Sequence, residues 1–330
     1  MMTPNPEVPT QILPYGRAAI ARAAKEILAG GMVAVPTETV YGLAADATDG
    51  AAVARIYAAK GRPSFNPLIV HVPDIAAARA LAAFDHRAEL LAHAFWPGPL
   101  TLVLPMRSSA PIASLVTAGL ETVAIRVPMH RAMRALLKAT GRPLAAPSAN
   151  ASGSISPTRA AHVVQSLGGR IPLVIDDGPT LKGIESTIVR EAFGTTRILR
   201  HGPITTDQVL RALADPTGRI ERFDLGEDAP DKIEAPGQIL THYAPRKPLR
   251  IGAPRAAADE YMIGFGPTPG DDTLSATGDL EEAAARLFDA LHRADASEKP
   301  RIAIAPVPID GIGEAINDRL RRAAYWGDQG

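Results

Sequence analysis

Short apolar runs of strand length alternate with amphipathic helical stretches along most of this chain, and that alternation constrains the fold more than any other feature. Residues 32–36 and 68–72, for example, are Val-containing apolar runs that follow stretches with helical periodicity. Strands that alternate with helices are typical of α/β proteins, in which helices cover a sheet. Residues 17–205 hold many such strands with short loops, which predicts a large, twisted mixed sheet with flanking helices.

The alternation stops between residues 215 and 246, which predicts an interdomain linker. This segment is polar, lacks clear periodicity and contains four prolines. Strand-like and helix-like stretches then resume and predict a small α/β, Rossmann-like second domain with a partly parallel sheet. Two domains are also what a length of 330 residues suggests. We therefore divide the chain into a loose leader (residues 1–16), a large domain (17–205), a helix with the linker (206–248) and a C-terminal domain (249–330).

The lack of cysteine removes several kinds of chemistry. Disulfides, thiolate catalysis, Cys-ligated zinc and iron–sulfur clusters all need Cys, and the chain has none. There is also no apolar run of about 18 residues, and the first 17 residues have no apolar core of a secretion signal. We expect a cytoplasmic protein without a membrane partner.

The formal net charge of zero hides an imbalance between the two halves. Residues 1–205 carry 20 Lys and Arg against 13 Asp and Glu, whereas residues 206–330 carry 15 against 22. A basic first half suits an anionic ligand, and it is equally what two domains with different solvated surfaces would give. The signatures G-x-x-x-x-G-K-[ST], G-x-G-x-x-G, H-E-x-x-H and G-x-S-x-G are absent, so P-loop ATPases, most dehydrogenases, zinc peptidases and serine hydrolases lose support.

Polar clusters at the ends of predicted strands are the main functional candidates. Residues 36–42 (Pro-Thr-Glu-Thr-Val-Tyr-Gly) place hydroxyls directly after a strand, where they suit a small ligand or an ordinary turn. Residues 146–153 combine small side chains with Ser148 and Asn150, which suits a close ligand or a flexible surface loop. Ser156 and Pro157 are typical of the N-cap and first position of a helix, whose N-terminus can hold an anion.

Cationic side chains at three further places also indicate an anion. Lys60 and Arg62 lie in a proline-braced loop that suits a phosphate clamp or a solvated basic turn. Arg126 stands inside an apolar strand, so it either binds a substrate carboxylate or forms an internal salt bridge. Arg200 follows a strand and suits a phosphate contact or an exposed surface, and His71 suits a hydrogen-bonded core position better than catalysis. No His, Asp or Glu spacing predicts a metal cage, so we expect any Mg²⁺ to arrive with nucleotide phosphates.

Taken together, these segments resemble the YrdC/Sua5 family, whose members are threonylcarbamoyl-AMP synthases. The shared motifs occur in the family's order at residues 36–43, 60–68 (Lys-x-Arg-Pro-x-x-Asn-Pro-Leu), 96–101 (Trp-Pro-Gly-Pro-Leu-Thr), 123–128 (Val-Ala-Ile-Arg-Val-Pro), 146–150 (Ala-Pro-Ser-Ala-Asn) and 185–188 (Glu-Ser-Thr-Ile). The family's Lys-x-Arg and Ser-x-Asn signature is complete as Lys60, Arg62, Ser148 and Asn150. Residues 236–245 and 311–320 resemble the linker and the end of the small C-terminal domain of long, Sua5-type members, with Gln238 where those commonly carry Met.

The resemblance implies a YrdC-like first domain, a small Sua5-type second domain and a nucleotidyltransferase activity. L-Threonine, bicarbonate and ATP would give L-threonylcarbamoyladenylate and pyrophosphate. A separate transferase would then move the threonylcarbamoyl group onto tRNA to make the modified adenosine t6A at position 37. The resemblance also implies Mg²⁺ bound with ATP and no organic cofactor. The partners would be ATP, L-threonine, bicarbonate, the tRNA-modifying transferase machinery and, as a further candidate, tRNA.

The resemblance implies site residues as well, which we carry over as hypotheses. Lys60 and Arg62 would be the catalytic residues, and Tyr243 in the linker would fold over the nucleotide as a lid. The threonine site would consist of Thr39, His71, Arg126 (on the carboxylate), the backbone near Ala146, and Ser186. The ATP site would consist of Lys60, Arg62, Asn66, Thr122, Ser148, Asn150, Ser156, Arg200 and Tyr243.

Three other functions compete with this one. A basic first half would suit an RNA-binding module without catalysis, although the aromatic residues needed for base stacking amount to only 5% of the chain. A hydrogenase-maturation carbamoyltransferase contains a YrdC-like part, but it carries acylphosphatase and zinc-finger segments that this Cys-free chain lacks. An inactive paralogue of the YciO type is disfavoured by the complete Lys60, Arg62, Ser148 and Asn150 set.

Overall fold

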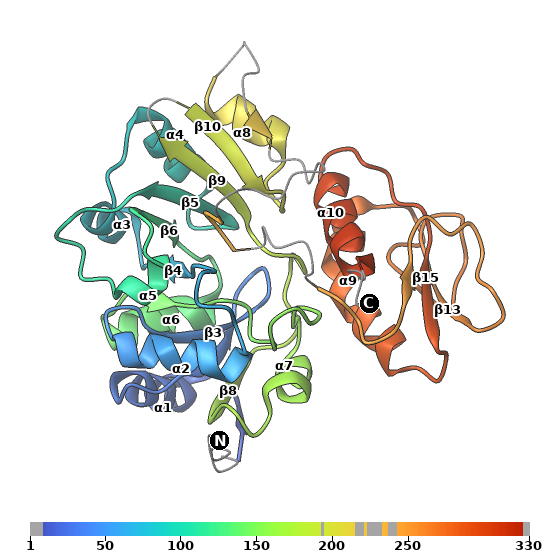
Figure 1. The fold of residues 1–330 in the computed structure, drawn as a ribbon, viewed down its shortest axis with the longest axis horizontal. Coiled ribbons are helices and arrows are strands. Elements are labelled where there is room, and N and C mark those ends of the chain that lie inside the picture. Colours follow the sequence, from blue (N-terminus) through green and yellow to red (C-terminus); the bar gives the residue numbers. More distant parts are fainter. Residues whose placement is uncertain (1–8, 193–194, 215–220, 223–232, 237–242, 326–330) are drawn as a thin grey trace.

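A computed structural model describes residues 9–192, 195–214, 221–222, 233–236 and 243–325, which form a large and a small α/β domain (Figure 1). The described part of the large domain holds one eleven-stranded sheet in the order β1-β8-β2-β3-β7-β4-β6-β5-β9-β10-β11. Its strands are β1 (Gln11–Pro14), β2 (Val33–Pro36), β3 (Tyr41–Asp46), β4 (Ile69–His71), β5 (Leu100–Pro105), β6 (Thr122–Arg126), β7 (Leu144–Ala145), β8 (Leu173–Asp176), β9 (Thr187–Ala192), β10 (Thr195–Arg200) and β11 (Glu221–Arg222). Parallel pairs such as β4 with β6 occur beside antiparallel pairs such as β2 with β3, so the predicted mixed sheet is confirmed.

Helices cover both faces of this sheet because its central strands are apolar on both sides. On β2, Ala34 faces one core while Val33 and Val35 face another, as the alternation of side chains in a strand requires. Helices α1 and α6 pack on the second core, and α2, α3, α4 and α7 pack on the first. The helices of this domain are α1 (Arg17–Leu28), α2 (Gly50–Lys60), α3 (Ile75–Leu81), α4 (His86–Phe95), α5 (Ser114–Thr117), α6 (Arg131–Thr140), α7 (Ala160–Leu167) and α8 (Thr206–Ala212).

The C-terminal domain is a four-stranded sheet with two helices on the side that faces the large domain (Figure 1). The sheet order is β12-β15-β13-β14, and every pair in it is parallel, which confirms the predicted small α/β domain. Its elements are β12 (Leu249–Arg250), β13 (Glu260–Gly264), β14 (Asp272–Thr273), α9 (Leu280–Ala296), β15 (Arg301–Ile304) and α10 (Gly313–Ala324). Among the described residues, none of the helices combines the length and apolarity that crossing a membrane needs.

The two domains contact each other closely through α9 and α10. At Gly183, a Cβ atom would lie only 2.3 Å from the backbone oxygen of Ala285, so the backbones of the two domains touch there. The rings of His162 and His292 stack across the interface with centroids 3.8 Å apart, and Arg159 pairs with Asp289 at 2.8 Å. These contacts fix the C-terminal domain against the loops that surround the first domain's strand ends.

The structure differs from the sequence-based expectations at two places, and part of the predicted linker is not described. Gln11–Pro14, which we predicted as part of a loose leader, is strand β1, because it pairs in parallel with β8. Helix α7 begins at Ala160 rather than behind an N-cap at Ser156, whose hydroxyl instead donates to a buried carboxylate. Of the predicted linker, residues 215–220, 223–232 and 237–242 lie outside the described residues.

Candidate active site

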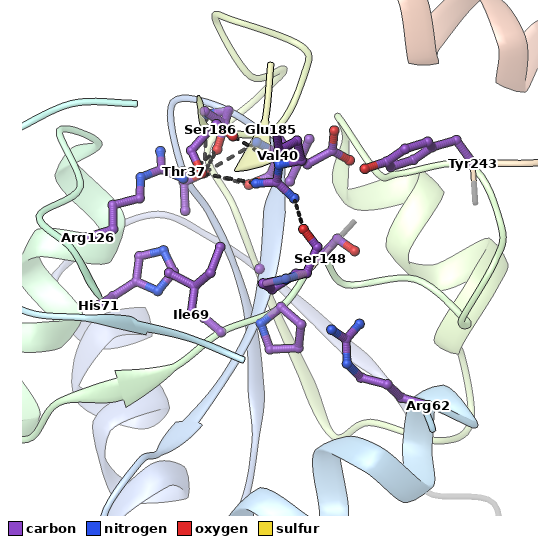
Figure 2. Close-up of a pocket in the computed structure, with 16 residues that line it drawn as sticks. Thr37, Val40, Arg62, Ile69, His71, Arg126, Ser148, Glu185, Ser186 and Tyr243 are labelled. Carbon is purple, nitrogen blue, oxygen red and sulfur yellow. Dashed lines mark hydrogen bonds between the residues drawn. The ribbon is translucent and has the colours of Figure 1, made fainter. Parts of the chain in front are cut away.

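A small enclosed pocket of about 40 Å³ lies where several strand ends of the first domain meet residues of the linker (Figure 2). Its walls come from strands β3, β4, β6 and β10, from the segments that follow β2, α2 and β7, from the segment that precedes β9, and from the linker. The predicted site residues that line it are Thr39, Arg62, His71, Arg126, Ala146, Ser148, Ser186, Arg200 and Tyr243. Members of the predicted threonine site and of the predicted ATP site therefore share one pocket.

Sheet register explains why His71 and Arg126 lie together. They are direct partners in the parallel pair β4–β6, so they project from the same face of the sheet. The preceding residues Val70 and Ile125 point to the opposite face and belong to the main core. Ile69, two residues before His71, forms the apolar part of the same wall (Figure 2).

Arg126 forms an internal salt bridge at this wall. Its Nη2 donates to Glu38 Oε1 at 2.5 Å, its Nη1 donates to Thr39 Oγ1 at 2.9 Å, and its Nε donates to the carbonyl of Gly98 at 3.2 Å. Burial disfavours the ionised form of Glu38, but the adjacent guanidinium outweighs burial and lowers the pKa of Glu38. Of the two alternatives for Arg126, the salt bridge is present, and the side chain also faces the pocket.

Lys60 and Arg62 occupy the C-terminal end of α2. Gly61 adopts the left-handed conformation with φ of 60°, which ends the helix between them. The ammonium of Lys60 donates to the carbonyls of Ser148 and Asn150 at 2.6 and 2.5 Å. Arg62 donates through Nη2 to Asn66 Oδ1 at 2.6 Å. The two signature segments that lie far apart in the sequence are thus joined by hydrogen bonds.

Arg200 approaches the pocket from the end of β10. Its Nε donates to the carbonyl of Ser186 at 3.0 Å, and its Nη2 donates to the hydroxyl of the same residue at 3.1 Å. Its Nη1 donates to the carbonyl of Pro236, a linker residue, at 3.4 Å. The Ser186 hydroxyl also shares a hydrogen bond of 2.8 Å with Thr101. Arg200 is therefore a buried wall residue and not the exposed surface arginine of the alternative interpretation.

Cations outnumber carboxylates at this site. Lys60, Arg62, Arg126 and Arg200 are each at most 8% exposed. Burial lowers the pKa of Lys60 well below its ordinary value, lowers that of Arg62 to about 10 and lowers that of Arg200. Among the described residues, the carboxylates of this site are Glu38, which pairs with Arg126, and Glu185. Because burying cations without counter-charge is costly, the site favours an anionic ligand such as a phosphate or a carboxylate.

Three further predicted site residues each have a buried polar atom without a hydrogen-bond partner. Within the described part of the chain, Asn66 Nδ2, His71 Nδ1 and Asn150 Oδ1 are buried without a hydrogen bond. Buried polar groups in proteins are nearly always paired, so unpaired ones that cluster need an explanation. Burial lowers the pKa of His71 to about 3, so its ring is neutral near pH 7. Of these three residues, His71 lines the pocket, so a polar ligand bound there would be able to pair with its Nδ1.

Tyr243 closes the pocket from the linker side (Figure 2). The side chain is fully buried, and burial raises the pKa of its hydroxyl. Its backbone is left-handed with φ of 68°, an uncommon conformation for a residue other than glycine. The next residue is tied down, because the amide of Ala244 donates to the carbonyl of Gly153 at 2.8 Å. The linker therefore contacts the loop that follows the Ser-x-Asn segment.

The remaining predicted residues lie outside the pocket wall. Lys60 and Asn66 each hydrogen-bond to a residue that lines it, and Asn150 hydrogen-bonds to Lys60. Ser156 lies behind Glu185, to whose Oε1 it donates at 2.5 Å. Thr122 is four residues before Arg126 on the same face of β6, which places it about 13 Å along the strand. The structure does not bring Thr122 to the pocket.

Sequence reasoning missed several lining residues. The charged lining residue that we did not assign is Glu185, and Glu38 behind the wall was also missed. Both lie inside motifs that we quoted for their hydroxyl groups. The sequence signal that could have identified both residues is an acidic residue next to hydroxyl residues at a strand end. The other lining residues that we did not assign are Thr37, Val40, Gly42, Ile69, Pro147 and Pro236.

Comparison with known proteins gives matches over both domains. Residues 25–202 match the family model described as "Telomere recombination", and residues 204–325 match the model described as the C-terminal domain of threonylcarbamoyl-AMP synthase. A threonylcarbamoyl-AMP synthase of Bacillus subtilis is 43% identical over 326 residues, 92% of this chain and 92% of that protein. The protein of that name from Pyrococcus abyssi is 38% identical over 322 residues, 92% of this chain and 93% of that protein.

Solved structures agree with these matches. The crystal structure of P. abyssi Sua5 complexed with L-threonine has a TM-score of 0.85 and 36% identity, and it covers 96% of this chain and 97% of that chain. E. coli YciO has a TM-score of 0.53 at 21% identity and covers 59% of this chain and 96% of that chain, so it shares the fold of the large domain.

Proposed function

This chain belongs to the YrdC/Sua5 family of threonylcarbamoyl-AMP synthases, in its long, two-domain form, and we propose that it forms L-threonylcarbamoyladenylate from L-threonine, bicarbonate and ATP. The observation that carries the proposal for this site is the group of buried cations with unpaired polar atoms among them. One end of the site suits a carboxylate and the other suits phosphates. A nucleotidyltransferase that joins an amino acid to a nucleotide needs both.

The chemistry suits a site without an acid–base pair. The amino group of threonine attacks the carbon of bicarbonate, and water leaves to give a carbamate. A carbamate oxygen then attacks the α-phosphorus of ATP, the bond to the β-phosphate oxygen breaks, and pyrophosphate leaves. Such a transfer depends on in-line positioning and on neutralisation of phosphate charge more than on a strong general base. An enclosed pocket would also keep water from the labile carbamate.

We assign the threonine end to the wall around Arg126. Spare N–H groups of Arg126 would bind the carboxylate of threonine, because only one donor of each terminal nitrogen is used within the protein. Thr39 and Ser186 would contact the substrate's polar groups, and the backbone at Ala146 would complete the wall. The neutral His71 could then accept or donate one hydrogen bond without adding charge.

We assign the nucleotide to the opposite end. Lys60 and Arg62 would neutralise the phosphates during transfer, with Arg200 beside them. Ser148, Asn150, Asn66, Ser156 and Tyr243 would hold the rest of the nucleotide. Mg²⁺ would enter with the ATP phosphates as part of the substrate. Thr122 has no support from its position and carries no role in this proposal.

The linker would act as a lid. A pocket of about 40 Å³ holds a few water molecules at most, since one water needs about 10–15 Å³ of such space. ATP would therefore enter only if part of the wall moved, and Pro236 and Tyr243 are the wall residues that the linker contributes. Closure of such a segment commits the substrate and excludes water. The product would then pass to a separate transferase that modifies tRNA.

An omission series tests the activity. The protein is incubated with MgATP, bicarbonate and threonine, each is left out in turn, and pyrophosphate release is measured. We expect release to need all three, and serine to substitute poorly for threonine. Lys60→Gln should lower the rate by about 100-fold or more, as loss of a charge that stabilises a transition state does. The exposed Lys138→Gln is the matched control and should keep the wild-type rate. A folded protein without turnover that binds RNA in a salt-sensitive way would favour the RNA-binding module instead.

A further inference from the structure

Arg319 of α10 crosses from the C-terminal domain to the pocket of the large domain. Its side chain is fully buried, and its Nε donates to Glu185 Oε2 at 2.8 Å. Its Nη2 donates to the backbone carbonyl of His201 at 2.9 Å. Glu185 directly precedes Ser186, and His201 directly follows Arg200. A single guanidinium thus ties down both segments that carry these two wall residues.

Arg319 also balances the charge of Glu185. Glu185 lines a pocket that otherwise carries cations, and its Oε1 accepts a hydrogen bond from Ser156 at 2.5 Å. A carboxylate at this position would repel the phosphates of a bound nucleotide if nothing neutralised it. Behind it, Arg319 contacts Asp318 at 2.5 Å, and Asp318 contacts Arg322 at 3.0 Å. Two arginines therefore face two carboxylates, and these four groups carry no net charge.

The same guanidinium supports Tyr243. Its central carbon lies 5.1 Å from the centre of the Tyr243 ring, within the range of a cation–π interaction. On the other side, the ring packs against Phe288 of α9 with centroids 5.5 Å apart. The hydroxyl end of Tyr243 points toward Glu185 across the pocket (Figure 2). The C-terminal domain thus holds both the carboxylate and the aromatic ring that border the nucleotide end.

We propose that Arg319 is a positioning residue for ATP, contributed by the C-terminal domain: it neutralises Glu185 and orders the Glu185–Ser186 and Arg200–His201 segments together with Tyr243. The ATP site is complete only when α10 is docked on the large domain. This inference rests on the proposed function, because it takes ATP as the ligand of the pocket. It gives the C-terminal domain a direct part in substrate binding.

Calorimetric titration of ATP into four folded proteins tests the proposal. Wild-type protein is compared with Arg319→Gln, with Glu185→Gln and with the double variant that carries both changes. Arg319→Gln should weaken ATP binding about tenfold or more, since it leaves a buried carboxylate uncompensated beside the phosphates. Glu185→Gln keeps an acceptor for Ser156 and removes the charge, so it should bind ATP within about threefold of wild type. The double variant should recover most of the affinity that Arg319→Gln loses.

If Arg319 had a purely structural role, adding Glu185→Gln to Arg319→Gln would weaken ATP binding further and would not restore it. Arg159→Gln removes an interdomain ion pair away from the pocket and serves as the control, with ATP affinity expected near that of wild type. If Arg319→Gln does not fold, the ATP affinity of Glu185→Gln alone tests the proposal. An affinity at least tenfold weaker than that of wild type then overturns it. Unchanged ATP affinity in folded Arg319→Gln, or no recovery in the double variant, also overturns it. Wild-type protein that does not bind ATP would instead contradict the proposed function.

Discussion

At the scale of single residues, the pocket is defined by buried cations whose partners are mostly neutral. Lys60 and Arg62 donate to carbonyl and amide oxygens and Arg200 to carbonyls and a hydroxyl, whereas Arg126 has the carboxylate of Glu38. The sequence predicted these cations as candidates because each stands in or beside an apolar strand or a braced loop. It could not separate a salt bridge from a ligand contact at Arg126, because its partner Glu38 is 88 residues away in the chain.

The salt bridge of Arg126 changes how that residue must be tested. Removing the guanidinium alone would leave the buried Glu38 with the amides of Met129 and His130 but without a counter-charge, and breaking a buried ion pair in this way typically costs about 3–5 kcal/mol. Arg126→Gln combined with Glu38→Gln avoids that cost and should fold with near wild-type stability. We expect this double variant to bind threonine at least about tenfold more weakly in calorimetry, since the guanidinium that we assign to the carboxylate is gone. Threonine affinity equal to that of wild type would remove Arg126 from the substrate site.

His71 should make stability depend on pH. Its pKa is about 3 in the folded protein against an ordinary value of 6.5, so the folded state binds fewer protons than the unfolded state between these values. Stability therefore rises with pH in this window and is lost as pH falls from about 6.5 toward 3. At pH 5 the loss from this group should be about 2 kcal/mol relative to pH 7.

Urea unfolding at pH 7 and pH 5 measures this contribution. His71→Asn removes the titrating group, so the variant should lose about 2 kcal/mol less between the two pH values than wild type does. His162, whose pKa burial also lowers to about 3, is present in both proteins and cancels in the comparison. An identical pH response in the two proteins would contradict a buried, neutral His71.

At the scale of elements, periodicity predicted most helices and strands but missed β1 and β3, as well as the short elements α5, β11 and β14. Strand β3 (Tyr41–Asp46) is buried along its whole length, so it shows no alternation of apolar and polar residues, and we interpreted its first residues as a turn. Strand β1 is exposed along most of its length and gains its order from pairing with β8, a contact that no local pattern encodes.

The loop after β10 should be sensitive to small changes. A Cβ atom on Gly202 would lie 2.4 Å from the amide nitrogen of Thr187 and 2.7 Å from the carbonyl oxygen of Glu185. Gly202→Ala must therefore push the Glu185–Thr187 segment away and disturb the hydrogen bonds between Ser186 and Arg200. Overpacking of this kind costs about 1–3 kcal/mol. We expect a lower thermal midpoint together with weaker binding of both substrates.

Gly50→Ala is the matched control, because its new Cβ would meet only Ala113 at an ordinary 3.9 Å. Its stability and its substrate affinities should stay at wild-type values. Should Gly202→Ala bind threonine and ATP as wild type does, the Glu185–Thr187 segment would not be part of the site wall.

At the scale of the whole molecule, the pocket is lined by the large domain and the linker, and the C-terminal domain supports its wall through Arg319. Arg319 is 134 residues from Glu185 in the sequence, and only the docking of α10 brings the two side chains together. Motifs identified the first domain's share of the pocket, because each motif is continuous in the chain. The second domain's share escaped sequence reasoning, since Arg319 is one of three arginines within residues 319–322 of an amphipathic helix and looks like a solvated charge. Fusion of the C-terminal domain to the catalytic domain keeps Arg319 close to Glu185.

The proposed reaction is tested most directly by isotope labelling of its product. The protein is incubated with MgATP, ¹³C-bicarbonate and ¹⁵N-threonine, and the nucleotides are separated and analysed by mass spectrometry. We predict an adenylate that carries both labels and appears in step with pyrophosphate, since a carbamate of threonine attacks the α-phosphate. Pyrophosphate release with an adenylate that lacks either label, or no labelled adenylate from folded protein that binds both substrates, would contradict the account.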